Sequence, residues 1–204
     1  MRIQPIHCVQ LSVKKETRQK KSGGSLMKRL KNYIANFLHP KPANPIKNYG
    51  LPVKGDFIVS SPYGMRIDPI SKRESFHTGI DFAVAEGHSV AAIESGVVLR
   101  ANSHKDYGLL VIIVHADGIA SLYAHLSELL VNSGEKVKKG QVIALSGNSG
   151  RSTGAHLHFE IIKKEFVGLL NGGNGGLGIY ATKQINGVHV ETRINPAKIL
   201  KNLV

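Results

Sequence analysis

The sequence has little of several residues on which whole classes of proteins depend. Its 204 residues include one cysteine, Cys8, and no tryptophan. One cysteine excludes an intramolecular disulfide framework and the thiolate-rich zinc sites that need several cysteines. Any metal ion would therefore have to be bound by imidazole and carboxylate groups, and ten histidines are many for this length.

Long apolar runs are also missing. The longest wholly apolar stretch is residues 109–114, far shorter than the ~20 residues that a membrane-spanning helix needs. Residues 1–21 carry charge but no apolar segment, so they do not resemble a secretory signal peptide. Met27 is a second candidate start. The sequence therefore predicts neither a spanning helix nor a clear export signal.

Acidic residues are scarce in the first quarter of the chain. Residues 1–54 hold twelve Lys or Arg and one acid, Glu16, a balance of +11, whereas residues 55–204 carry only +2. A nucleic-acid-binding protein normally carries its positive charge on the folded part, so nucleic acid is not an expected partner. The basic N-terminus would instead attract anionic wall polymers or a membrane surface.

Composition divides the chain into three segments. Residues 1–24 are basic and polar and end in Ser-Gly-Gly, which is typical of a disordered leader. Residues 25–54 begin with apolar side chains at helical spacing, which predicts a short helix, and continue as a proline-rich linker. Residues 55–204 form the predicted folded domain.

The third segment has the pattern of a mainly β domain. Short apolar stretches recur every ~8–12 residues between turns rich in Gly, Asn, Asp and Ser, and no long amphipathic helix interrupts them. This spacing predicts an all-β sandwich or barrel, with one short helix at residues 196–203 because proline favours a helix start. The predicted strands are residues 57–60, 80–83, 89–92, 96–101, 109–115, 119–123, 141–145 and 157–162.

Histidine and aspartate occur at metal-ligand spacing in two places. His77 and Asp81 are four residues apart, so an extended segment would place them on one face. His156 and His158 share a face by the same rule, opposite Leu157. Each motif alone also fits a hydrogen-bonded turn or a core histidine. Together they favour a zinc ion, which compensates the cost of burying imidazole.

Two imidazoles and one carboxylate are the ligand number of a catalytic zinc site, because a fourth position remains for water. His77, Asp81 and one of the pair His156 and His158 would form such a set. The other member of the pair would lie close enough to move protons. His125, in a Tyr-Ala-His-Leu motif, is a further candidate.

Four ordered motifs resemble the lysostaphin-type (LytM-like) zinc endopeptidases of peptidoglycan. The resemblance covers about residues 56–162, continues weakly to Asn195-Pro196, and implies an antiparallel β core with a narrow groove over one zinc ion per chain. The implied substrates are peptide bonds of bacterial cell-wall stem peptides or cross-bridges. The motifs are Ser-Pro-Tyr-Gly-Met-Arg at 61–66, Phe-His-Thr-Gly-Ile-Asp-Phe at 76–82, Leu-Tyr-Ala-His-Leu at 122–126 and Gly-Asn-Ser-Gly-Arg-Ser-Thr-Gly-Ala-His-Leu-His-Phe-Glu at 147–160.

The resemblance also implies individual roles. His77, Asp81 and His158 match the zinc ligands, and His125 and His156 match the two catalytic histidines beside them. Because none of these five positions departs from the family pattern, we expect an active zinc metalloendopeptidase. It would act outside the cytoplasm, in the periplasm or cell wall, by an export route that the sequence does not reveal.

Two other interpretations remain. A zinc-bearing but inactive peptidoglycan-binding or regulatory module would carry the same ligands. The other is a carrier or a barrel-type interaction protein. Repeated Gly-x-x-Val patterns suggest a biotinyl or lipoyl carrier, but the turn at residues 146–150 lacks the lysine that such a carrier modifies.

Two features of the sequence have open roles. Glu160 shares a face with His158, so it either orients that ligand or is an ordinary cross-strand partner. The glycine-rich stretch near residues 163–185 looks like an insertion. It is either a surface loop or a lid or groove wall that shapes substrate access.

Overall fold

The computed structural model describes residues 48–171, 182–185, 188–200 and 203. The leader at residues 1–24 and the predicted helix that follows it lie outside the described residues, as does the centre of the glycine-rich stretch. In the described part of the chain, no helix has the length and apolar character needed to cross a membrane.

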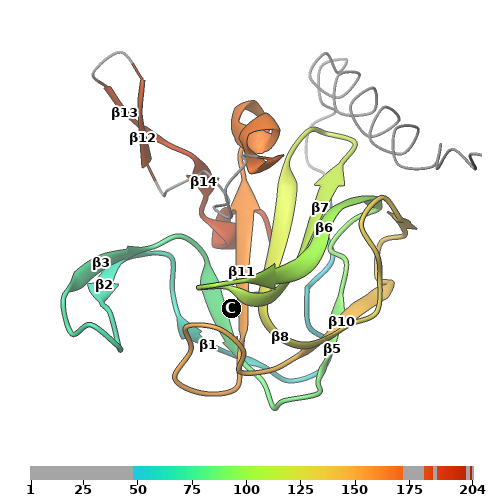
Figure 1. The fold of residues 1–204 in the computed structure, drawn as a ribbon, viewed down its shortest axis with the longest axis horizontal. Coiled ribbons are helices and arrows are strands. Elements are labelled where there is room, and N and C mark those ends of the chain that lie inside the picture. Colours follow the sequence, from blue (N-terminus) through green and yellow to red (C-terminus); the bar gives the residue numbers. More distant parts are fainter. Residues whose placement is uncertain (1–47, 172–181, 186–187, 201–202, 204) are drawn as a thin grey trace, which may run out of the picture.

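The fold is mainly β and antiparallel, which confirms the predicted fold class (Figure 1). Ten strands form one sheet with the order β1-β4-β11-β8-β7-β6-β9, while β10 pairs with β5 and β8 and β14 pairs with β11. These strands are β1 Ile58–Ser61, β4 Ile80–Ala83, β5 Ser89–Ala91, β6 Gly96–His104, β7 Gly108–His115, β8 Ala120–Leu129, β9 Lys136–Val137, β10 Val142–Ser146, β11 Leu157–Ile162 and β14 Arg193–Ile194.

Two hairpins and two short helices complete the described structure. The helix predicted at residues 196–203 is a single 3₁₀ turn, in which proline begins the turn and the Asn195 side chain accepts a hydrogen bond from Ala197 N. The hairpins are β2 Gly64–Ile67 with β3 Glu74–His77 and β12 Thr182–Ile185 with β13 Val188–Glu191, and the helices are η1 Lys164–Asn171 and η2 Pro196–Lys198.

Strand β7 is apolar along almost its whole length because both faces of the sheet are covered. Successive side chains point to opposite faces, so Val111 and Ile113 belong to one buried cluster while Leu110 and Ile112 belong to the other. Phe166 of η1 packs in the second cluster. This double burial accounts for the longest apolar run of the sequence.

Strand pairing brings the two halves of the predicted site together. β11 lies between β4 and β8, and its register places His158 opposite Asp81 on one side and Ala124 on the other. Gly79, just before β4, lies so close to β11 that a Cβ atom there would be 2.3 Å from the Phe159 carbonyl oxygen. Glycine is therefore needed at this close approach of two backbones.

All eight predicted strands are present, and β4 and β11 have the predicted bounds. β6 and β8 extend beyond the prediction. The β2–β3 hairpin was not predicted. Its Met65 and Ile67 side chains are exposed, and neither strand contributes a residue to the two buried clusters.

Candidate metal centre

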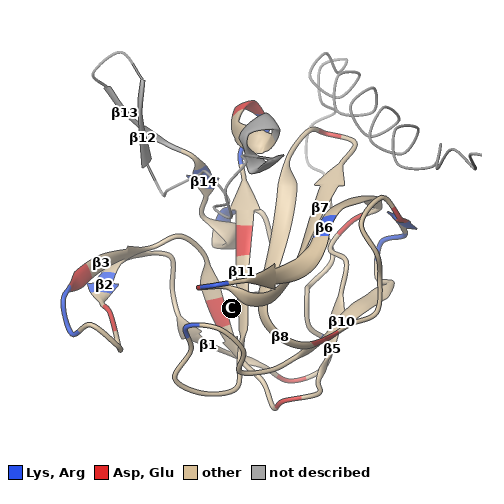
Figure 2. Cartoon of the chain, in the orientation of Figure 1, with Lys and Arg blue, Asp and Glu red and all other residues tan. Residues whose placement is uncertain are grey.

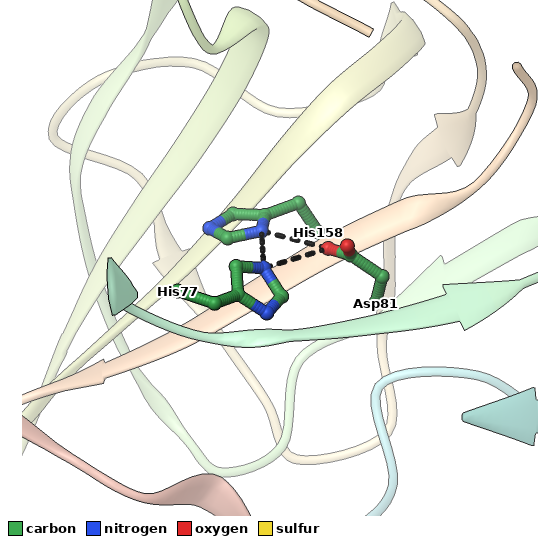
Figure 3. A group of neighbouring side chains, drawn as sticks. All are labelled: His77, Asp81 and His158. Carbon is green, nitrogen blue, oxygen red and sulfur yellow. Dashed lines mark hydrogen bonds and ion pairs between the residues drawn. The ribbon is translucent and has the colours of Figure 1, made fainter. Parts of the chain in front are cut away.

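His77, Asp81 and His158 converge on one point (Figure 3). His77 Nε2 lies 3.2 Å from Asp81 Oδ1, His158 Nδ1 lies 2.8 Å from the same oxygen, and the two nitrogens are 3.1 Å apart. Atoms bound ~2.0–2.1 Å from a tetrahedral zinc ion are roughly 3.3 Å apart. These three buried side chains therefore have the donor types and the spacing to hold a metal ion.

His77 and Asp81 do not share one face of a single strand, as their spacing suggested. His77 ends β3 of the separate hairpin, whereas Asp81 lies in β4 of the main sheet. The chain changes direction between them at Thr78 and Gly79. This turn, rather than strand alternation, brings the two side chains together.

His77 and His158 each use one ring nitrogen to fix the orientation of the ring. His77 Nδ1 donates to the Pro62 carbonyl oxygen at 2.8 Å, and His158 Nε2 donates to Glu160 Oε1 at 3.0 Å. His77 Nε2 and His158 Nδ1 are thus the nitrogens that can give a lone pair to a metal.

Glu160 lies at the centre of a buried hydrogen-bond network next to His158. Its carboxylate also accepts hydrogen bonds from the Tyr107 hydroxyl at 2.7 Å and from Thr78, and it forms an ion pair with Arg193. Glu160 and Arg193 are fully buried. The contact with His158 favours the interpretation in which Glu160 orients a ligand.

The charges of this network keep two carboxylates ionised. Burial raises the pKa of Glu160, but Arg193 and His158 outweigh burial and hold that pKa well below its usual range. Burial likewise opposes ionisation of Asp81, whose hydrogen bonds with His158 and His77 nevertheless hold its pKa well below its usual range. For His158, burial lowers the pKa, but hydrogen bonds to Asp81 and Glu160 raise it to about 9. Without a metal ion His158 therefore carries a proton at pH 7, and that proton would have to leave when Nδ1 binds a metal.

Arg66 holds the second oxygen of Asp81. Its Nη1 atom donates to Asp81 Oδ2 at 3.2 Å and also to the Ser61 hydroxyl. Asp81 can therefore direct Oδ1 to the metal centre while Oδ2 stays hydrogen-bonded. Sequence reasoning assigned Arg66 no role, although it ends the first motif.

His125 and His156 lie beside these three candidate ligands. Their ring centroids are 4.8 Å apart, and His156 Nε2 lies 3.7 Å from Asp81 Oδ1. His125 Nδ1 donates to the Ser149 carbonyl oxygen at 2.8 Å, and His156 Nδ1 donates to the Gly154 carbonyl oxygen at 2.7 Å. In both rings Nε2 is left as the atom that can accept or deliver a proton.

A bulge in β8 sets the position of His125. Pairing with β7 advances two residues on β7, from Leu109 to Val111, but three residues on β8, between Leu126 and Tyr123. His125 has a φ of 59°, a left-handed conformation that costs about 1–3 kcal/mol for a non-glycine residue and is concentrated at functional sites. Burial lowers the pKa of His125 to about 4, so its ring is neutral at pH 7.

A groove of about 510 Å³ runs beside Asp81 and His156. One wall comes from β1, β2 and the turn after β2, and the other from residues 153–156. Asp68 and Arg151 join the segments that carry these walls through a bidentate ion pair of 2.7 and 3.0 Å. Figure 2 shows one acidic band within the central strand β11, whose single acidic residue is Glu160, whereas most Lys and Arg lie at turns and edges.

Residues 75–175 match Peptidase family M23. Among curated proteins, the chain is similar to "Peptidoglycan DD-endopeptidase ShyA" of Vibrio cholerae, with 43% identity over 112 residues that make up 54% of this chain and 26% of that protein. The chain spans about a quarter of the length of the curated relatives it matches.

Two solved structures share the fold. The antimicrobial peptidase lysostaphin from Staphylococcus simulans has 28% identity and a TM-score of 0.53, with 72% of this chain and 50% of that chain covered. The catalytic domain of the prophage-encoded M23 protein EnpA from Enterococcus faecalis, solved as a point mutant, has 28% identity and a TM-score of 0.51. That match covers 78% of this chain and 95% of that chain.

Proposed function

Through residues 75–175 the chain belongs to peptidase family M23, and from that premise we propose that it is a zinc-dependent endopeptidase of bacterial peptidoglycan. The observation that carries the proposal is the convergence of His77, Asp81 and His158 with two further histidines beside them. The name of the similar Vibrio cholerae protein supports a peptide bond of peptidoglycan as the substrate.

His77 Nε2, Asp81 Oδ1 and His158 Nδ1 would hold one zinc ion per chain. Zinc bound by two imidazoles and a carboxylate supplies Lewis acidity, which polarises a carbonyl group and makes a water acidic enough to react near neutral pH. Pro62, Glu160 and Arg66 keep the three ligands in the required orientation through the hydrogen bonds described above.

His125 and His156 are the proposed proton-transfer groups. The neutral ring of His125 can accept a proton at Nε2, because its Nδ1 proton is held by a backbone carbonyl. The Nδ1 proton of His156 is held in the same way, and this ring lies nearer to Asp81. Once its Nε2 has accepted a proton, His156 can stabilise negative charge on the attacked carbonyl or deliver that proton to the leaving amine. Glu160 is not available as a base, since its oxygens accept hydrogen bonds from four side chains.

The site of action would be outside the cytoplasm, where peptidoglycan lies. The basic leader at residues 1–24 would add electrostatic attraction to anionic wall polymers or to a membrane surface, an effect that salt weakens. Nucleic acid is not among the proposed partners.

A digest of purified peptidoglycan tests the proposal. The protein should release monomeric muropeptides from cross-linked ones, as followed by mass spectrometry. Exhaustive chelation should abolish the release and added zinc should restore it. Full activity after chelation would contradict metal dependence. Binding to peptidoglycan without cleavage would favour the alternative of a zinc-bearing but inactive binding or regulatory module.

A further inference from the structure

Arg66 uses only part of its hydrogen-bonding capacity on the metal centre. Its Nη1 atom donates to Asp81 and Ser61, whereas a guanidinium group carries five N–H donors. In the segments that the structure describes, Nε and Nη2 of Arg66 have no hydrogen-bond acceptor. These two nitrogens form the other edge of the guanidinium plane.

That edge is accessible from the groove. The Arg66 side chain is 28% exposed, and it lines the groove together with Asp81 and His156. Apart from Arg66, Asp81 and His156, the lining residues carry no ionisable side chain. They are Ser60, Ser61, Ile67, Pro69, Ala83, Thr153, Gly154 and Ala155.

Arg66 is therefore the permanent cation among the lining residues of this groove, placed directly beside a metal ligand. A guanidinium edge with two parallel N–H groups matches the two oxygens of a carboxylate. Partial enclosure strengthens such a pair relative to one on an open surface, because less water screens it.

We propose that Arg66 binds a carboxylate of the substrate in this groove, within about one residue of the bond that is cut. This inference rests on the proposed function and narrows its substrate class to peptides with a free carboxylate at that place. The carboxylate can belong to a side chain or to a peptide C-terminus, and both present the same two oxygens. Arg66 would then connect the substrate to Asp81 through opposite edges of one planar group.

The simpler role for Arg66 is to orient Asp81 alone. In that case its replacement lowers activity on every substrate by the same factor. If Arg66 also binds a carboxylate, its replacement removes a preference between substrates. The two roles are distinguished by measuring wild-type and Arg66-substituted protein on substrates with and without the carboxylate, as in a double-mutant cycle.

The test uses three synthetic cross-linked stem-peptide dimers with the full chain loaded with zinc. One dimer has all carboxylates free, one has only the C-terminal carboxylates amidated, and one has only the side-chain carboxylates beside the cross-link amidated. Wild-type protein should cleave the free form with a kcat/KM about ten- to a hundredfold above one of the amidated forms, the range expected for a hydrogen-bonded charge. The amidated form that reacts slowly identifies the source of the carboxylate.

Arg66→Gln should reduce that preference to less than threefold. The control Arg73→Gln removes the same charge from an exposed position next to β3 that does not line the groove, and it should keep the preference. No preference in the wild type, or an unchanged preference in Arg66→Gln, overturns the proposal. If the wild type cleaves none of the dimers, it is the proposed function that fails.

A binding measurement covers the case in which Arg66→Gln loses zinc. A dimer with an uncleavable bond is titrated into chelated wild-type and variant proteins by calorimetry. The free carboxylate form should bind the wild type about tenfold or more tightly than its amide, and the variant should bind both forms equally. Equal binding of both forms to the wild type overturns the proposal.

Discussion

Glu160 Oε1 and His158 Nε2 lie 3.0 Å apart on the same face of β11. Because the carboxylate accepts a hydrogen bond from Nε2–H, the other nitrogen of the ring faces Asp81 at 2.8 Å. A carboxylate behind a ligand histidine fixes the ring and makes it a stronger donor. Metal affinity should therefore depend on a residue that would not itself touch the metal.

Replacing Glu160 by glutamine should weaken zinc binding about 10- to 100-fold, the usual effect of removing such a partner. The variant should also unfold more easily, by about 3–5 kcal/mol, because the buried Arg193 loses its ion pair with Glu160. Competition with a chromophoric chelator measures the zinc affinity on protein kept well below its unfolding temperature.

The control for Glu160 is Glu165→Gln, the same chemical change at an exposed position in η1. It should leave the zinc affinity within about twofold. A Glu160→Gln protein that is folded and binds zinc as tightly as the wild type would contradict the role given to Glu160.

Substitutions of the five central residues should fall into two groups. His77→Ala, Asp81→Ala and His158→Ala should lose the metal itself, as elemental analysis after dialysis would show. His125→Ala and His156→Ala should retain about one zinc ion per chain but lose ~10²–10⁴-fold in turnover, the usual contribution of general acid–base catalysis.

His88→Ala is a suitable control for this series, because His88 binds the Lys54 carbonyl oxygen instead of any of the five residues. Its zinc content and turnover should match the wild type. If His125→Ala and His156→Ala both turned over at the wild-type rate, the assignment of proton transfer to these rings would be wrong.

The Asp68–Arg151 ion pair should make a small, acid-sensitive contribution to stability and to substrate binding. Asp68→Asn keeps the acceptor that Ile70 N and Ser71 N use but loses the charge. Because the Arg151 side chain is 44% exposed, we expect a loss of about 1 kcal/mol or less, together with a few-fold rise in KM as the groove walls separate.

The pH dependence follows from the lowered pKa of Asp68, which hydrogen bonds from Arg151 and from the backbone of Ser71 hold well below its usual range. A depressed carboxyl pKa stabilises the fold above the pKa of the unfolded chain, ~3.9, and this stability is lost as the pH falls further. The difference between wild type and Asp68→Asn should be constant from pH 7 to about 5 and disappear in stronger acid. Denaturant titrations measure it. A difference that grows below pH 4 would contradict the prediction.

Gly79→Ala should destabilise the fold and disturb the metal centre together. The added Cβ would lie 2.3 Å from the Phe159 carbonyl oxygen, so β4 and β11 would have to separate. Overpacking of this kind costs about 1–3 kcal/mol, and it would also move Asp81 away from His158.

Urea unfolding and zinc affinity measure the two effects of Gly79→Ala. The matched control is Gly154→Ala, where a Cβ atom meets nothing within 4 Å, and its stability should be close to that of the wild type. Equal stability of the two variants would show that the backbone at Gly79 has more room next to Phe159 than a Cβ-to-oxygen distance of 2.3 Å allows.

Local patterns in the sequence were sufficient for the strands that form the core. In β4 and β11, apolar residues alternate with polar ones or follow one another directly, a pattern that predicts a buried strand. Both strands have the predicted bounds. The β2–β3 hairpin was not predicted because its apolar residues Met65 and Ile67 are exposed and do not form the pattern of a buried strand. His125 was found by its motif, but the bulge that turns it could not be, since it depends on pairing with β7.

The sequence by itself determined which donor types are present: imidazole and carboxylate with almost no thiol, at His77, Asp81, His125, His156 and His158. Only the tertiary structure decided how they meet, because the register of β4 on β11 places Asp81 opposite His158. It also gathered Thr78, Tyr107 and Arg193 around Glu160. Those partners come from segments far apart in the chain. They meet because a buried carboxylate needs hydrogen-bond partners, and no local spacing in the sequence reveals which residues these are.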